Sequence, residues 1–190
     1  MHKQTNIRKL TLMGFGVALN IVGAFIALQF KLPIYLDSIG TILIACLLGP
    51  KYAVLTGLSG SLISGITFDI YSLYFAPVQI TTGFLAGIMY KKSWLKSKRI
   101  FIGVLCFVLP TSLISAIIAA ILFGGITSSG SSYVVQVLIT LGFGDVASIF
   151  MTQILTDYID KLMAVILVGV GIKVLPNQIK YSILDLGKDK

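Results

Sequence analysis

Hydrophobic and polar positions alternate in long blocks along this chain, with six apolar stretches separated by short polar segments. About 20 apolar residues are needed to cross the hydrocarbon core of a bilayer as a helix. The pattern predicts six transmembrane helices, over residues 10–30, 34–48, 52–66, 75–90, 100–123 and 154–175. We therefore expect an all-α integral membrane protein in which residues 1–190 form a single membrane domain.

The composition supports placing the chain in lipid. Hydrophobic residues make up 56% of it, charged residues only 12%, and the mean hydropathy is +0.97. A soluble domain carries about 25% charged residues, which cover its water-facing surface. This chain has too few charged residues for such a surface, so we expect a multi-pass protein of the cell membrane.

The basic residues predict the orientation of the six spans. Cytoplasmic loops of membrane proteins are enriched in Lys and Arg. All but two of the 15 Lys and Arg residues precede the first stretch, lie near the end of the sixth or after it, or lie between stretches two and three or four and five. Only Lys31 and Lys161 fall elsewhere. With six spans these positions share one side of the membrane, so both termini are predicted to be cytoplasmic.

The residue inventory argues against an enzyme. His2 is the only histidine, at the very start of the chain, and the sequence contains no Glu. General acid–base catalysis most often uses His, and zinc sites use His and Cys. The chain also lacks the G-x-x-x-x-G-K-[ST] loop that binds the phosphates of ATP. We expect no catalytic residues, no metal and no cofactor.

Acidic residues mark one half of the predicted bundle. Apart from two Asp residues in the C-terminal tail, all acids map to the extracellular half: Asp37, Asp69, Asp145, Asp157 and Asp160. Charges at membrane depth are costly and tend to mark ligand or ion pathways. Two interpretations remain open. The acids either line a binding site, or Asp37 and Asp69 cap helices and all five are solvated.

The start of the sixth stretch gives the sharper signal. Asp157 and Lys161 are four residues apart, so they share a helix face and can pair. The pair either serves packing alone or lines a polar pocket. The loop 67–78 adds Tyr71 and Tyr74, and Gln79 lies one turn inside the fourth stretch. Such aromatic residues are either interfacial anchors or part of a site for a small planar solute.

Two further segments stand out. Residues 124–151 are too interrupted for a span, and we interpret them as an extracellular loop with a short helix over the bundle, placed like a lid. In the first stretch, Gly14 and Ala18 are four residues apart, and Gly23 and Ala27 repeat that spacing. Small residues at this spacing let helices approach closely in lipid. They serve packing within the chain or docking onto another membrane subunit.

Three motifs together suggest a family. They are Leu36-Asp37-Ser38-Ile39-Gly40-Thr41 followed by Leu48-Gly49-Pro50, the Gly- and Ser-rich third stretch, and Asp160-Lys161. With six predicted helices and a basic loop between the fourth and fifth, the chain resembles the substrate-binding (S) component of energy-coupling factor (ECF) vitamin transporters. The resemblance covers nearly the whole chain.

The resemblance implies a function and partners. Such a subunit binds a small water-soluble vitamin and works with a transmembrane coupling (T) subunit and two ATPases, which hydrolyse the ATP. A small-x-x-x-small motif on helix one contacts the T subunit in that family, and Gly14 and Ala18 match its position. The family's pocket lies near the extracellular side, under the first and third loops. The candidate substrate-binding residues are Asp37, Asp69, Tyr71, Tyr74, Gln79, Asp157 and Lys161.

Several alternatives for cargo and function follow from the same residues. A pyrimidine or pyridine such as hydroxymethylpyrimidine or a pyridoxine-like vitamin fits first, and pantothenate second, with Lys161 meeting its carboxylate. The alternative functions are a structural or regulatory membrane subunit without a solute site, and a small autonomous carrier. A carrier usually shows an inverted repeat or a continuous polar path, and the sequence shows neither. Nucleic acid is not an expected partner.

Overall fold

A computed structural model describes residues 2–176 of the chain. The tail residues Lys180, Lys188 and Lys190, which contributed to the predicted orientation, lie outside the described residues. Over the described range the regular elements are helical: α1 (His2–Gln29), α2 (Ile39–Leu47), α3 (Pro50–Thr67), α4 (Ile70–Tyr74), α5 (Ala76–Lys91), a 3₁₀ turn (Ser97–Arg99), α6 (Ile100–Phe123), α7 (Ser131–Thr140) and α8 (Asp145–Val174).

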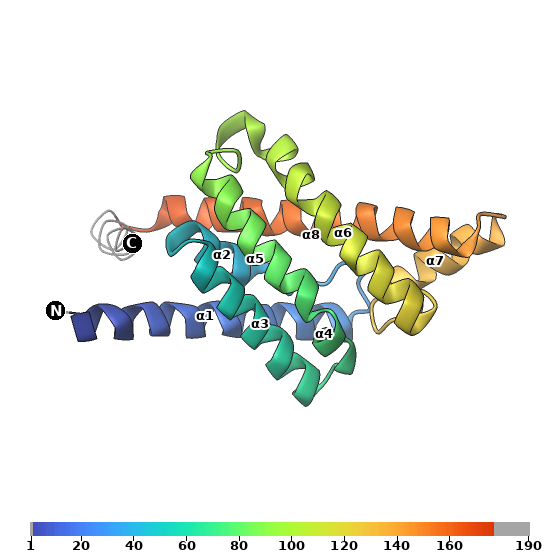
Figure 1. Ribbon diagram of the computed structural model, residues 1–190, viewed down its shortest axis with the longest axis horizontal. Coiled ribbons are helices and arrows are strands. Elements are labelled where there is room, and N and C mark those ends of the chain that lie inside the picture. The colour runs from blue at the N-terminus through green and yellow to red at the C-terminus, as the bar shows by residue number, and fades with distance from the viewer. Residues whose placement is uncertain (1, 177–190) are drawn as a thin grey trace.

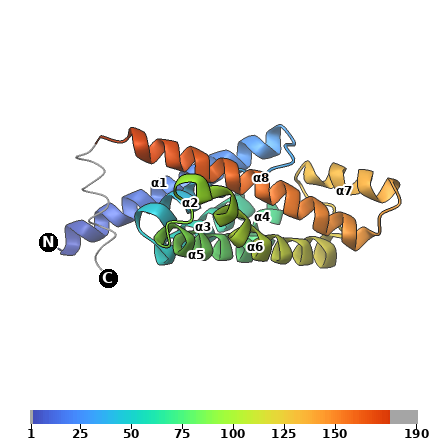
Figure 2. The ribbon, with the colours of Figure 1, turned by 90° about the horizontal axis from the view of Figure 1, so that it is seen from above.

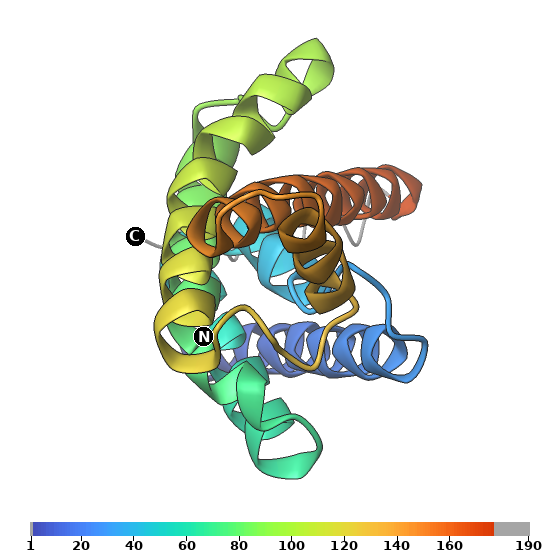
Figure 3. The ribbon, with the colours of Figure 1, turned by 90° about the vertical axis from the view of Figure 1, so that its right-hand side faces the viewer.

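The long helices form two layers around a short central helix. In Figure 1, α1 and α8 run antiparallel along the long axis. Figures 2 and 3 show α3, α5 and α6 side by side as a second layer that crosses them. Between the layers lies α2, which contacts α1, α3, α5 and α8. Seven of the nine α2 residues are buried, so the centre of the fold is built around this helix.

The two ends of the bundle differ in which segments they hold. The N-terminus, the end of α8 and the α2–α3 and α5–α6 connections lie toward the left of Figure 1. The connections 30–38, 68–75 and 124–144 lie toward the right, where α7 packs beside α8. This grouping agrees with the side of the membrane that the basic residues predict for each connection.

Hydropathy located the helices well and their ends less well. The fifth stretch, predicted over 100–123, is α6 with those bounds. By length and composition, two described helices suffice to cross a bilayer, over Asn6–Gln29 and Ile100–Phe123. Helical geometry satisfies most backbone groups within the segment, as lipid requires, although Pro110 inside α6 cannot donate a backbone bond. Six complete crossings therefore stay a prediction.

The second apolar stretch does not begin a helix near residue 34, so that prediction is wrong. A helix of nine residues is only about 14 Å long, half the thickness of a hydrocarbon core. The preceding segment is held out of helical geometry because Leu36 has a φ of 53°. Gly49, with a φ of 91°, then turns the chain directly into α3, a conformation that strains any residue with a Cβ.

The sixth helix also begins earlier than predicted. It starts at Asp145 rather than near residue 154, so Asp157 and Asp160 lie in its middle and do not open it. The polar residues of its first half lower the hydropathy, yet many of them are buried, including Ser148, Thr152 and Gln153. Residues 124–151 are thus partly helix α8, and α7 is the short helix expected there.

Candidate functional site

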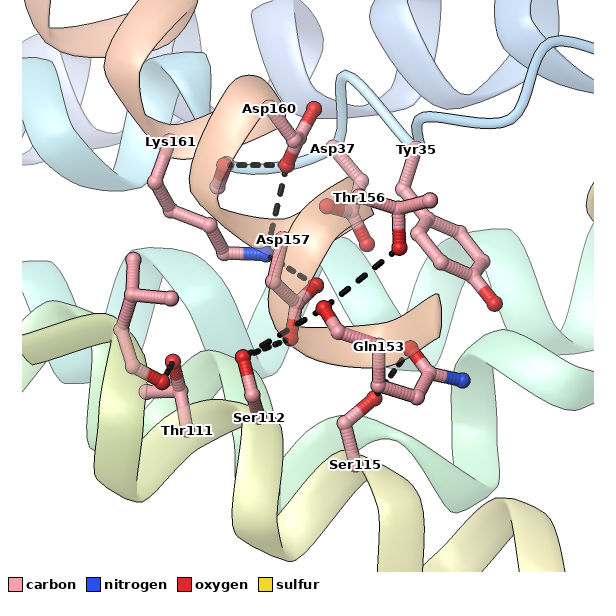
Figure 4. A network of polar contacts seen from close by, with 12 residues as sticks. Tyr35, Asp37, Thr111, Ser112, Ser115, Gln153, Thr156, Asp157, Asp160 and Lys161 are labelled. Atoms are coloured by element: carbon pink, nitrogen blue, oxygen red, sulfur yellow. Dashed lines mark hydrogen bonds and ion pairs between the residues drawn. The ribbon is translucent and has the colours of Figure 1, made fainter. Parts of the chain in front are cut away.

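An ion-pair network of three buried residues lies in the middle of α8 (Figure 4). Lys161 Nζ donates to Oδ1 of Asp157 at 3.1 Å and to Oδ2 of Asp160 at 3.2 Å. Lys161, Asp157 and Asp160 are 2%, 1% and 0% exposed. A buried charge without a partner is strongly destabilising, so each member offsets part of the cost of burying the others. The predicted Asp157–Lys161 pair is present, and Asp160 adds a third charge.

Helix α6 supplies hydroxyl groups to this part of α8. Ser112 Oγ donates to Oδ2 of Asp157 at 2.9 Å, and Ser115 Oγ donates to Oε1 of Gln153 at 3.1 Å. The two serines are three residues apart, so they lie on one face of α6, and Figure 4 shows both pointing at α8. Sequence reasoning did not select either serine, although the run from Thr111 to Ser115 interrupts an otherwise apolar helix.

Asp160 connects α8 to the segment between α1 and α2. The backbone N–H of Leu36 donates to its Oδ1 at 2.8 Å, and Ser38 Oγ donates to its Oδ2 at 3.3 Å. These bonds hold Leu36 in its left-handed conformation, which a residue with a branched side chain rarely adopts. Because Tyr35 and Asp37 flank Leu36, these bonds restrain the backbone from which both side chains project.

A second polar chain ties three helices to the same segment. Asn20 Oδ1 of α1 accepts from the amides of Gly40 and Thr41 at 2.7 and 3.2 Å, which caps the start of α2 from another helix. Asn20 Nδ2 donates to Thr41 Oγ1, and Thr41 Oγ1 donates to Gln79 Oε1 on α5. Gln79 Nε2 donates to the carbonyl oxygen of Asp37 at 3.3 Å. The buried amide of Gln79 thus has partners within the protein.

These segments surround a cavity. Including its open mouth, the space between the side chains measures about 370 Å³. Only about 20 Å³ is free for a water-sized molecule, so a ligand needs the lining side chains to move apart. Six of the seven predicted substrate-binding residues line it, together with residues from the α1–α2 connection and α6. Its lining is Tyr35, Asp37, Asp69, Tyr71, Ser72, Phe75, Val78, Gln79, Ser115, Asp157 and Lys161.

A smaller cavity adjoins the first. It measures about 280 Å³ and shares Tyr35, Asp37, Asp69 and Ser72 with it. Its other walls come from the end of α1, from the connection that follows it and from residues 128–129. No cluster of three or more His, Cys, Asp or Glu side chains suited to a metal ion occurs among residues 2–176.

Aromatic rings form one wall of the cavity. Tyr71 packs against Phe123 with ring centroids 4.7 Å apart, and Phe75 stacks on the same ring at 6.3 Å. Tyr74 is the predicted site residue that does not line the cavity. It is 47% exposed, and its ring meets Phe123 edge-on from the other side. Sequence reasoning had missed Tyr35, although it lies only two residues before Asp37.

The electrostatic environment of Asp37 is unusual. Its Oδ1 is shielded from solvent and has no hydrogen-bond partner among the described residues. Burial raises the pKa of this carboxyl to about 6, although the nearby ammonium of Lys161 acts in the opposite direction. A carboxylate that is difficult to hydrate and lacks a donor favours any group that brings a hydrogen or a positive charge. Burial also raises the pKa of the Tyr35 hydroxyl.

The small residues of α1 divide between two faces. Gly16 and Gly23 face inward, where a Cβ on Gly16 would lie 2.8 Å from Ile44 and one on Gly23 would collide with the backbone of Leu36. Gly14 and Ala18 are exposed, and nothing lies within 4 Å of a Cβ built on Gly14. Packing within the chain therefore uses the Gly16–Gly23 face and leaves the predicted docking pair uncovered.

The comparisons with known proteins agree with these features. A family model described as ECF transporter, substrate-specific component, matches residues 8–184, nearly the whole chain. Neither the curated proteins nor the solved structures include a match. An S component is a membrane-embedded, substrate-binding subunit and not an enzyme, which fits apolar helices that surround a polar cavity. The resemblance drawn from the sequence motifs is thereby confirmed, and the chain belongs to the family of ECF transporter substrate-specific components.

Proposed function

We propose that this chain binds a small water-soluble vitamin or vitamin precursor with high affinity and delivers it for ATP-dependent uptake. The observation that carries the proposal is the cavity beside the buried Asp157–Lys161 pair. Five separate parts of the chain contribute to it: the α1–α2 connection, α4 with its flanks, α5, α6 and α8. A fold that needs only to pack in lipid has no reason to bring so many polar groups to one point, because each is costly there.

The proposed ligand contacts are the lining residues that the sequence singled out, namely Asp37, Asp69, Tyr71, Gln79, Asp157 and Lys161. Tyr35 and Ser115 join them because they line the same space. For Tyr74 we propose a supporting role, in which its contact with Phe123 fixes the ring on which Tyr71 packs. The two tyrosines Tyr35 and Tyr71 supply aromatic surface for a flat solute.

The proposed cargo is a single-ring vitamin. Aromatic walls and a few polar groups suit hydroxymethylpyrimidine or a pyridoxine-like compound first, and pantothenate second, with the lining side chains moving apart to admit the ring. Six spans with both termini in the cytoplasm complete the proposed topology. In the proposed complex, Gly14 and Ala18 meet the T subunit, and two ATPase subunits supply the energy.

Mass spectrometry of the small molecules released from the purified, detergent-solubilised chain tests the proposal. We expect a vitamin in stoichiometric amount, and its loss from the Tyr71→Leu variant. Tyr133→Leu is the matched control, because Tyr133 is an exposed tyrosine on α7 and lines neither cavity described above. If no molecule is retained and no vitamin raises the melting temperature of the chain, the structural or regulatory subunit is the better interpretation.

A further inference from the structure

The charged groups around the cavity are unequal in number. Asp37, Asp69 and Asp157 line it, and Asp160 lies directly behind Lys161. Lys161 is the one cationic side chain among the lining residues, and it already donates hydrogen bonds to both Asp157 and Asp160. With these carboxylates ionised, the site carries more negative than positive charge before any solute arrives.

The excess of negative charge around the cavity affects which solutes can bind there. A ligand carboxylate would enter a space that already contains several carboxylates, and Lys161 would have to leave existing partners to meet it. Like charges at short distance in a poorly hydrated site repel strongly. The carboxylate of a pantothenate-like solute therefore has no unengaged cation to bind among the lining residues.

Asp37 provides the complementary observation. Its Oδ1 is buried and unpartnered, while Gln79 Nε2 donates to its backbone carbonyl oxygen and the Gln79 side chain also acts to lower the pKa of the carboxyl. Asp160 holds the backbone of the adjacent Leu36, and the Asp37 side chain lines the cavity, lying near Asp157 in Figure 4. A hydrogen-bond donor, above all a charged one, satisfies this oxygen.

We infer that the cavity selects a small aromatic heterocycle carrying a cationic or hydrogen-bond-donating nitrogen directed at Asp37, and rejects solutes that bear a carboxylate. The inference rests on the proposed function and narrows its substrate class. It places an aminopyrimidine or an amine-bearing pyridine inside the class and pantothenate outside it. The rings of Tyr35, Tyr71 and Phe75 then contact the heterocycle, whereas the Asp37 carboxylate binds its nitrogen.

Matched pairs of compounds test the inference on the purified full chain in detergent. Each pair shares a skeleton and differs in charge: pyridoxamine and 4-pyridoxate, nicotinamide and nicotinate, pantothenol and pantothenate. Titration calorimetry is expected to show that the member without the carboxylate binds at least tenfold tighter in every pair that binds. The inference would be overturned by a pair in which the compound that carries the carboxylate binds more tightly. A retained natural ligand that carries a carboxylate would overturn it as well.

The variant Asp37→Asn removes the charge and preserves the shape. We expect about 10–100-fold weaker binding of the preferred member, since a charge-assisted hydrogen bond is lost. The difference in affinity between the two members of the pair should also become smaller. Asp145→Asn is the control, because Asp145 is exposed and lines neither cavity described above. An unchanged difference in Asp37→Asn contradicts the assignment of Asp37. If no pair binds and no ligand is retained, it is the proposed function itself that fails.

Discussion

The two halves of α8 bury their inner faces in opposite ways. Up to Lys161 the buried residues are mainly polar or charged: Ser148, Thr152, Gln153, Thr156, Asp157, Asp160 and Lys161. Beyond it they are apolar, namely Ala164, Val165, Val168 and Ile172, and they belong to the main hydrophobic core. One continuous helix thus changes from a polar to a dry environment within about one turn.

The difference shows what each half needs from the rest of the protein. The apolar half packs against neighbours of any matching shape, and its stabilisation scales with buried area. The polar half needs a specific partner for each group. Gln153 and Asp157 find theirs on α6 and Asp160 in the α1–α2 connection, whereas the hydroxyls of Ser148 and Thr152 have none among the described residues. Among the residues that line the cavity, Asp37 has the one buried side-chain oxygen without a partner, and a ligand can supply the missing donor.

The largest effect is expected from Lys161→Met, which removes the one ammonium of the network. Asp157 and Asp160 would remain buried without their cation, and breaking a buried ion pair in this way costs about 3–5 kcal/mol. Thermal unfolding in detergent measures the change. Ile172→Val, in the apolar half, is expected to cost only about 0.5–1.5 kcal/mol. Equal losses in the two variants would contradict the contrast between the halves.

Asp160→Ala tests whether α8 positions the binding segment. The amide of Leu36 and the hydroxyl of Ser38 lose their acceptor, so the connection 30–38 is expected to loosen. Hydrogen exchange at Leu36 should rise, and the affinity for the retained ligand should fall by about tenfold or more. Asp160→Asn, which keeps an acceptor oxygen for Leu36, should show slower exchange than Asp160→Ala. Unchanged exchange in the alanine variant would remove Asp160 from this role.

The contrast between the two halves of α8 also explains which features could be predicted from the sequence. Apolar stretches located the helices because a helix in lipid must satisfy its own backbone hydrogen bonds. The start of α8 escaped this signal because it holds buried polar residues, such as Gln153, which accepts a hydrogen bond from Ser115 of α6. Asp157 and Lys161 were found from their spacing alone. The hydrogen bond from Leu36 to Asp160 joins residues 124 positions apart, and no local sequence pattern predicts such a contact.

A pH titration sharpens the role of Asp37. The groups that face it are Asp157, Asp160 and Lys161 from α8, Asp69 before α4, and the phenols of Tyr35 and Tyr71. Its pKa of about 6 in the folded chain exceeds the ordinary value of 3.8. Ionisation is thus less favourable in the folded state, and the stability of the ligand-free chain falls as the pH rises from about 4 through 6.

Ligand affinity should change in the opposite direction. An aliphatic amine such as that of pyridoxamine stays protonated from pH 5 to 7, while Asp37 becomes ionised. Because the inferred contact needs the carboxylate, the affinity should rise by up to about tenfold over this range. Calorimetry at pH 5, 6 and 7 measures it, and Asp37→Asn should abolish the rise. A flat profile in the unchanged chain would remove Asp37 from the ligand contact.

The smallest effect on the chain itself is expected at the exposed pair of α1. Gly14→Leu with Ala18→Leu meets open space, so the free energy of unfolding should change by no more than about 0.5 kcal/mol. The matched control is Gly40→Ala, whose Cβ would collide with the backbone of Gly16 and force α1 from α2. We expect the double variant to fold and bind ligand yet to lose co-purification with the T and ATPase subunits. If the complex instead survives two leucines at this face, docking must use another surface, and the exposure of Gly14 and Ala18 reflects contact with lipid.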